Sequence, residues 1–183
     1  LSAGPFLKVK GKAGQAVTIG VSELSDKPWE GHSYTYTLKG EGEESFRPRF
    51  TYFGFQYLFV SGVDRPEDAS GNGERPILLE LGADFVTSSA RAVGSFHCDN
   101  ALLNDIDDMV TRSVRSNLQS VLTDCPHREK LGWLEVSHLM GPSIAYHYDI
   151  SGLYGKICRD TTESQLENGL VPDIAPEYTR FPS

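Results

Sequence analysis

The chain has 183 residues with 25 acidic and 17 basic side chains, which give a formal net charge of -8 and a pI of about 5.1. This acidic balance argues against nucleic acid and anionic membranes as partners, because both repel a negatively charged surface. Hydrophobic residues make up 39% of the chain, an ordinary globular composition, and no apolar run approaches the roughly 20 residues that a membrane span needs.

Both ends of the sequence differ from those of a complete protein. The chain opens at Leu1–Pro5 with neither an initiating Met nor a basic start, and residues 176–183 contain no capping element. We therefore expect an internal piece of a longer protein, whose compartment the sequence does not fix, although a periplasmic or secreted location is favoured over the cytoplasm. The cysteines are Cys98, Cys125 and Cys158, an odd count at wide spacing that indicates no disulfide framework.

The first half of the chain is typical of short β-strands joined by turns. Alternating or β-branched and aromatic residues predict strands over 15–21, 33–38, 46–50, 53–60 and 77–86, the last with a turn inside it. Glycine-rich or polar segments at 40–44 and 65–75 predict the longer connections. Many short strands of this kind indicate a β-sandwich.

Aromatic side chains are frequent in this half and allow two interpretations. Trp29, Tyr34, Tyr36 and the run Phe53–Phe59 would suit a face on which sugars stack. The same residues also suit core and cross-strand packing, which we favour because aromatic pairs stabilise sheets.

The pattern becomes helical after residues 94–96. Apolar residues recur at steps of three and four from Leu102 to Leu118, with Asp99 or Asn100 as the N-cap. A second helix is predicted from Trp133 to Tyr148, started or kinked by Pro142. Ser151 is expected to cap a third helix that runs to Gln165, with Gly169 as its stop and a proline-rich loop beyond it. We therefore expect two domains, at residues 1–93 and 94–183.

The loop Thr123–Glu135 concentrates reactive side chains between two predicted helices. Asp124 and Glu129 bracket it, and Trp133 offers an apolar wall that would desolvate a carboxylate and raise its pKa, as a general acid requires near neutral pH. Paired carboxylates beside an indole are typical of the active sites of glycoside hydrolases. Ion pairing of Glu129 with Arg128 or Lys130 would oppose this by favouring the charged form. The plain alternative is an N-cap at Asp124 and a surface pair at Glu129.

Metal and phosphate sites have weaker support. Adjacent His97 and Cys98, and the pair Cys125 and His127, chelate a tetrahedral zinc ion poorly, and no paired spacing adds the remaining ligands. His138 and His147 fit exposed or satisfied helix positions. The Gly-x-Gly pattern around residue 71 lacks the following helix that would bind a phosphate. We expect no metal and no cofactor.

The segment Thr123–Trp133, which reads TDCPHREKLGW, resembles the motif of bacterial α-L-rhamnosidases, glycoside hydrolase family 78. In that motif Asp-Cys-Pro is followed by a few polar residues that include the catalytic Glu, and then by Leu-Gly-Trp. Residues 52–57, 115–120 and 165–178 are also similar to members of the family. The resemblance covers nearly the whole chain.

The resemblance implies a β-sandwich of concanavalin-like type followed by the first helices of an (α/α)6 barrel, and inverting cleavage of terminal α-L-rhamnose from glycosides or polysaccharides. It implies that Glu129 is the general acid, Asp124 a ligand of a sugar hydroxyl, and Trp133 part of the rhamnose pocket, with Arg128 shaping the site. The catalytic base of the family is a Glu much later in the barrel, so we expect these 183 residues alone to show no turnover.

The chain departs from the family pattern directly after the motif. Many members continue the Trp with x-Gly-Asp, and that Asp binds the sugar, whereas here Trp133 is followed by Leu134, Glu135 and Val136. Val136 stands in the place of the Asp, and Glu135 is a possible substitute as a substrate-binding residue. The departure leaves two alternatives open: another six-hairpin glycosidase or a lyase that acts on a different sugar, or a non-catalytic carbohydrate-binding β module.

Overall fold

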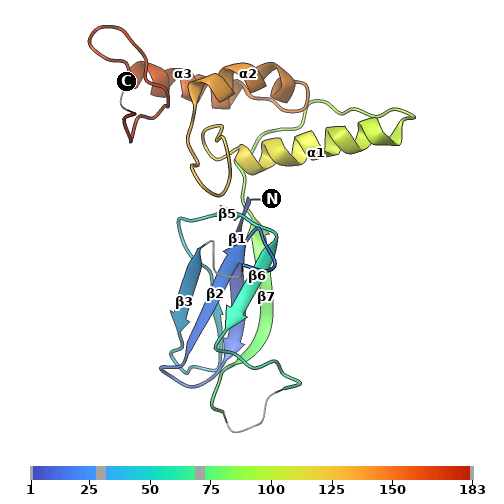
Figure 1. The fold of residues 1–183 in the computed structure, drawn as a ribbon, viewed down its shortest axis with the longest axis vertical. Coiled ribbons are helices and arrows are strands. Elements are labelled where there is room, and N and C mark those ends of the chain that lie inside the picture. The colour runs from blue at the N-terminus through green and yellow to red at the C-terminus, as the bar shows by residue number, and fades with distance from the viewer. Residues whose placement is uncertain (1, 28–31, 69–72, 182–183) are drawn as a thin grey trace. The chain divides into compact units, whose positions relative to one another are not determined.

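A computed structural model describes residues 2–27, 32–68 and 73–181 (Figure 1). It divides into two compact units, Leu1–Val86 and Thr87–Ser183, which we call the β unit and the helical unit. The predicted domain boundary at residues 93 and 94 stays a prediction. Trp29, from the aromatic group discussed above, lies outside the described residues, as does Gly71.

The β unit contains seven strands among its described residues. They are β1 (Ser2–Lys10), β2 (Ala16–Ser22), β3 (Ser33–Thr37), β4 (Glu43–Phe46), β5 (Phe53–Gly54), β6 (Tyr57–Ser61) and β7 (Ile77–Phe85). One sheet has β1 at its centre: β7 pairs along one edge, while β4 and β5 pair with successive parts of the other. The second sheet has the order β3-β2-β6, and every pairing in both sheets is antiparallel.

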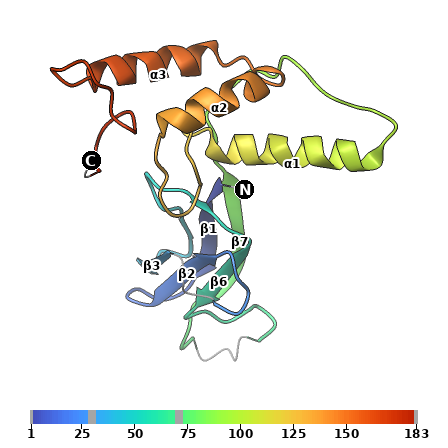
Figure 2. The same ribbon diagram turned by 45° about the horizontal axis from the view of Figure 1, so that its top comes forward.

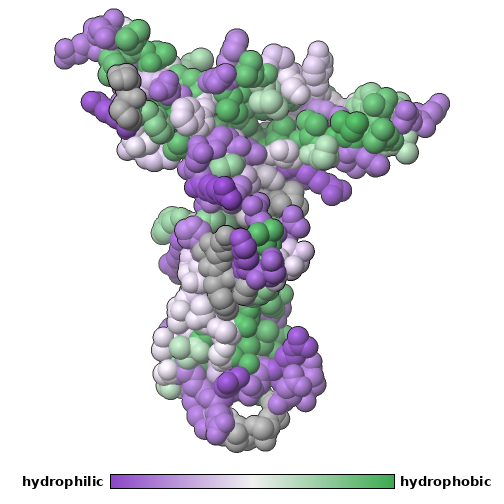
Figure 3. Space-filling model, in the orientation of Figure 1, coloured by the Kyte–Doolittle hydropathy of each residue, from purple (hydrophilic) through white to green (hydrophobic). Residues whose placement is uncertain are grey.

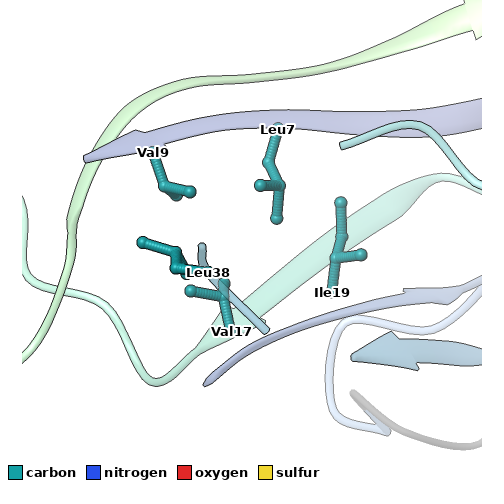
Figure 4. Close-up of a cluster of buried hydrophobic side chains, with 5 residues drawn as sticks. All are labelled: Leu7, Val9, Val17, Ile19 and Leu38. Atoms are coloured by element: carbon teal, nitrogen blue, oxygen red, sulfur yellow. The ribbon is translucent and has the colours of Figure 1, made fainter. Parts of the chain in front are cut away.

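The core of the β unit lies between these two sheets. Because side chains alternate along a strand, every second residue of β1 from Ala3 to Val9 is buried. Leu7 and Val9 of β1 face Val17 and Ile19 of β2, and Leu38 joins them just after β3 (Figure 4). A sandwich is therefore present, as the strand pattern predicts.

Several strand predictions need correction. The sequence pattern missed β1, where Pro5 interrupts a run that otherwise alternates. The predicted strand 46–50 ends at Phe46, because Pro48 lacks a backbone N–H and Phe50 has a left-handed φ of 57°. The predicted strand 53–60 is two strands that belong to different sheets, and β7 runs through its expected turn without a break.

The aromatic side chains of the β unit mostly pack within it. Tyr34 and Tyr36 contact the core, and their hydroxyls bond to the Thr51 hydroxyl and the Glu44 carboxylate respectively. Phe53 is buried and stacks on His32 at a centroid distance of 3.9 Å. The packing interpretation therefore holds for these residues, and Tyr57 at the edge is more exposed.

Glu44 is a buried carboxylate held entirely by local donors. Its oxygens accept from the backbone N–H groups of Lys39 and Gly40 and from the hydroxyl of Tyr36. These bonds, that of the Lys39 N–H first, lower the pKa of Glu44 to about 2. The carboxylate thereby closes the turn between β3 and β4.

The helical unit contains α1 (Ala101–Asn117), α2 (Leu134–Ala145) and α3 (Ser151–Glu163), and Figure 2 shows α2 lying between the other two. The predicted N-cap of α1 is confirmed at Asn100, whose Oδ1 accepts the Leu102 N–H at 3.0 Å. Pro142 lies inside α2. The prediction for α3 was wrong in detail: Ile150 is the N-cap, and the Ser151 N–H and hydroxyl donate to Asp149.

The apolar stripe of α1 is buried only at its C-terminal end. Val114 and Leu118 pack with Leu122 and Ile144 in the core of the helical unit. Leu102 is 65% exposed and Met109 63%. Figure 3 accordingly shows hydrophobic side chains at the surface over α1.

Candidate active site

Within the connection between α1 and α2, the chemically rich segment begins at a buried threonine. Thr123 is 3% exposed, and its backbone N–H donates to the Asn117 carbonyl at the end of α1 at 2.9 Å. Its hydroxyl also bonds to the Asn117 side chain at 2.9 Å. These bonds attach the start of the chemically rich segment to the C-terminal end of α1.

Asp124 closes the loop upon itself. Its backbone N–H donates to the Leu131 carbonyl at 3.1 Å, and its Oδ1 accepts the Leu131 N–H at 2.8 Å. Leu131 is buried, so this pairing is anchored on the apolar side as well. One carboxylate oxygen of Asp124 therefore stabilises the closed loop.

Inside this closed loop, Cys125 and Glu129 are joined. The Glu129 N–H donates to Cys125 Sγ at 3.2 Å. Lys130 follows with a left-handed φ of 58°, which is rare for a residue with a side chain. Burial lowers the pKa of Lys130, whose side chain is partly removed from water.

The side chains of Glu129 and Arg128 are exposed. Among the residues that the structure describes, the Glu129 carboxylate takes part in no ion pair with Arg128 or Lys130. The pairing that would oppose an acid role is therefore not formed. Glu129 stands at the loop surface with its carboxylate available to a ligand.

The last part of the loop pairs with a distant segment. Trp133 forms an antiparallel bridge with Ile174, and the Ala175 N–H donates to the Gly132 carbonyl at 3.1 Å. A Cβ at Gly132 would lie 2.7 Å from the Ala175 carbonyl oxygen, which explains a glycine at this position. The Trp133 ring stacks on Phe181 with centroids 5.0 Å apart.

A cavity of about 400 Å³ lies between α1 and α2, within the size range of ligand sites. Asp124 and Val136 both line it, with Ser113 and Asn117 as further polar walls. Most of the remaining lining is aliphatic. The cavity thus joins the predicted sugar ligand Asp124 to the position where the chain departs from the family motif.

The structure brings some of the predicted site residues together and separates others. Asp124 lines the cavity, whereas Glu129, Trp133 and Glu135 do not. Glu135 is exposed in the first turn of α2. The pairing of the loop with residues 173–175 was not predicted from the sequence. The signals that could have indicated this pairing are Gly132 and the prolines beyond Gly169.

The described part of the chain shows neither a metal-type cluster nor a membrane-spanning helix. There, no group of three or more His, Cys, Asp or Glu side chains converges as a metal site would require. Across the same residues, none of the helices has the length and apolarity for crossing a membrane. His147 Nε2 lies 2.9 Å from Asp107 Oδ1, which gives that histidine a local partner.

Two family models match the chain. Residues 91–183 match the bacterial alpha-L-rhamnosidase 6 hairpin glycosidase domain, and residues 1–74 match the bacterial alpha-L-rhamnosidase concanavalin-like domain. A concanavalin-like β domain is thus followed by a six-hairpin glycosidase domain. Together the two matches account for most of the sequence.

Individual proteins agree with the family models. An alpha-L-rhamnosidase of Formosa agariphila is 33% identical over 133 residues, covering 73% of this chain and 13% of its own. The alpha-L-rhamnosidase of Dictyoglumus thermophilum superposes with a TM-score of 0.80 at 29% identity, over 99% of this chain and 21% of that one. The Streptomyces avermitilis alpha-L-rhamnosidase, solved in complex with L-rhamnose, superposes with a TM-score of 0.77 at 28% identity, over 98% of this chain and 18% of that one. The chain therefore spans about a fifth or less of the length of these relatives.

Proposed function

Because the chain belongs to the bacterial α-L-rhamnosidase family, we propose that the protein of which it is part hydrolyses terminal α-L-rhamnose from glycosides or polysaccharides with inversion. The helices described above would be the first of an (α/α)6 barrel, preceded by a β domain that ends near residue 93. Rhamnose-containing saccharides are its partners, and the net charge of -8 over these 183 residues disfavours nucleic acid. No membrane partner is proposed, and the rest of its own chain completes the site.

Glu129 is the general acid of this proposal. Its protonated carboxyl donates to the glycosidic oxygen as the bond to the anomeric carbon breaks, so that the aglycone leaves as an alcohol. Water attacks the anomeric carbon from the opposite face and gives its proton to a second carboxylate. In inverting enzymes the two carboxyl groups are roughly 6.5–9.5 Å apart. That base is a Glu outside these 183 residues.

Four further side chains surround the sugar in this proposal. The carboxylate oxygen of Asp124 that Leu131 does not occupy accepts a hydrogen bond from a sugar hydroxyl, which is consistent with the position of Asp124 on the cavity wall. Trp133 offers its ring as an apolar wall, supported from behind by Phe181. Arg128 and Glu135 are exposed and contribute polar contacts from the loop and from the first turn of α2.

The family match carries the activity, and the observation that carries the acid assignment is a Glu129 carboxylate without an ion pair among the described residues, on a loop closed by Asp124 and Leu131. The test uses the full-length protein and an aryl α-L-rhamnoside. Glu129→Gln should lower kcat/KM about 10²- to 10⁴-fold, the usual contribution of general acid catalysis. Glu163→Gln, an exposed change at the end of α3, is the matched control and should leave the rate unchanged.

Two results would contradict the proposal. Full-length protein that hydrolyses no α-L-rhamnoside would remove the activity itself. A Glu129→Gln variant with the rate of the wild type would leave the activity in place and remove the acid assignment. Circular dichroism of both variants separates a chemical effect from loss of the fold.

A further inference from the structure

Cys125 has no part in the chemistry proposed above, although it lies four residues before the proposed acid. It is one of three free cysteines and is half-buried, unlike the exposed Cys158 on α3. Its Sγ accepts the Glu129 N–H at 3.2 Å, a contact across a turn of the loop. Sulfur is a weak acceptor, but here it binds the backbone N–H of the proposed acid itself.

The segment around this contact fixes Glu129 from both sides. On one side is the Cys125 thiol, and on the other Lys130 turns the chain through a left-handed φ of 58°. The turn lets the next backbone N–H, that of Leu131, reach the Asp124 carboxylate at 2.8 Å. Two consecutive side chains, Asp124 and Cys125, therefore hold the backbone N–H groups that flank Lys130.

An exposed glutamate needs this kind of support. A catalytic group has to stay within about 0.5 Å of its productive position, and this depends on the residues that hold its backbone and rotamer. Among the described residues, no ion pair orients the Glu129 carboxylate, so its direction depends on the backbone position. The contact with Cys125 restrains that position at Glu129 itself.

From this geometry we infer that Cys125 is a positioning residue, which aims the general acid Glu129 through its Sγ contact with the Glu129 N–H. The inference rests on the proposed function. It requires no oxidation and no metal, and the thiol touches neither sugar nor water in the reaction. Its effect is confined to proton donation, which gives it a specific kinetic consequence.

The test compares two substrates in the full-length protein. An α-L-rhamnoside of phenol, a poor leaving group, needs the proton of the acid, whereas one of 2,4-dinitrophenol needs little help. Cys125→Ala should lower kcat about tenfold for the phenyl substrate, as expected for about 1.4 kcal/mol of lost transition-state stabilisation, and less than about twofold for the dinitrophenyl substrate. Cys125→Ser, which keeps an acceptor, should recover most of the loss. Cys158→Ala is the matched control and should change neither rate.

A double-mutant cycle adds a second criterion. In the Glu129→Gln background, Cys125→Ala should cost nothing further, because a positioning residue acts only through the group that it positions. Equal losses for both substrates, no loss for either, or full additivity with Glu129→Gln would each overturn the inference. If Cys125→Ala does not fold, the near-isosteric Cys125→Val removes the same acceptor and is read by the same criteria.

The outcome is separable from a failure of the proposed function. Wild-type protein inactive on both substrates refutes the rhamnosidase proposal. An active wild type, a slow Glu129→Gln variant and a Cys125→Ala variant without leaving-group dependence refute only the role of Cys125.

Discussion

Replacement of Gly132 by alanine tests how the loop Thr123–Glu135 is held to the segment that ends the described chain. A Cβ at this position would lie 2.7 Å from the Ala175 carbonyl oxygen and 3.3 Å from the Val121 Cβ. The oxygen belongs to the backbone, so it cannot rotate away as a side chain would. Alanine must therefore push residues 173–175 away from the loop.

The magnitude follows from what that displacement breaks. Overpacking a well-filled site costs about 1–3 kcal/mol. Separating the two segments also weakens the bonds from the Ala175 N–H to Gly132 and from the Leu134 N–H to Asp173, at about 1 kcal/mol for a typical bond. We therefore expect Gly132→Ala to lower the free energy of unfolding of the helical unit by about 2–4 kcal/mol.

The matched control is the same substitution at Gly152. No atom lies within 4 Å of a Cβ there, and the residue is the second of α3. Alanine should stabilise this helix by about 0.5–1 kcal/mol. Urea unfolding followed by far-ultraviolet circular dichroism measures both changes. Fluorescence in a Trp29→Phe background reports separately on Trp133, since the chain has two tryptophans.

The free energy of unfolding should fall in Gly132→Ala and rise in Gly152→Ala. In Gly132→Ala the Trp133 emission should also shift toward that of a solvated indole, because its stacking on Phe181 depends on the pairing of the two segments. A Gly132→Ala variant as stable as the wild type, with unchanged emission, would refute the reasoning. So would destabilisation of equal size at Gly152.

Three further predictions concern single side chains. Because the pKa of Glu44 is lowered to about 2, stability that is fully present above its ordinary value near 4.5 should be lost as the pH falls toward 2, and melting temperatures of Glu44→Gln should vary less over that window. Asp124→Ala should lower the free energy of unfolding by about 1 kcal/mol, and Asp124→Asn should lose less because its amide oxygen still accepts the Leu131 N–H; urea titrations decide. Tyr154→Phe removes the bond from its hydroxyl to the Ser137 carbonyl and should lower the free energy of unfolding by about 1 kcal/mol in the same titrations; an unchanged value would contradict a contribution from this bond.

Local patterns predicted those parts of the fold that local forces decide. The period-two alternation of 15–21 marks a strand because one face of that strand is buried against β1. The N-cap at Asn100 was predictable because the cap bond spans only two residues. Such features need no knowledge of distant segments.

The misses have a common cause in long-range pairing. The run from Phe53 to Val60 is uniformly strand-like, yet β5 joins β1 and β6 joins β2, so the switch between sheets depends on partners far away. The central strand β1 was missed because Pro5 argues against a strand locally, although its neighbours alternate well. Tertiary context decided both cases.

The same division applies to the candidate site. The residues Asp124 to Trp133 are recognisable from the motif alone, since their types and order carry the resemblance. The closure of the loop by Leu131 and the pairing of Trp133 with Ile174 are not recognisable, because nothing local states which backbone groups meet. The motif therefore identifies the candidate site residues, whereas their arrangement depends on long-range contacts that the sequence does not reveal.

Position 136 bears on the proposed binding of the sugar. Val136 packs against the apolar core of the helical unit and lines the cavity beside Asp124. Glu135 precedes it on α2, and adjacent residues on a helix do not face the same direction, so the exposed Glu135 side chain lies on a different face of α2 from Val136. A carboxylate in place of Val136 would stand among aliphatic side chains and would need a sugar hydroxyl or another donor to offset its burial. Val136 removes that requirement and makes the cavity wall more apolar. In the proposed function, any contact from Glu135 to the sugar then comes from the surface side, as an interaction separate from the cavity wall.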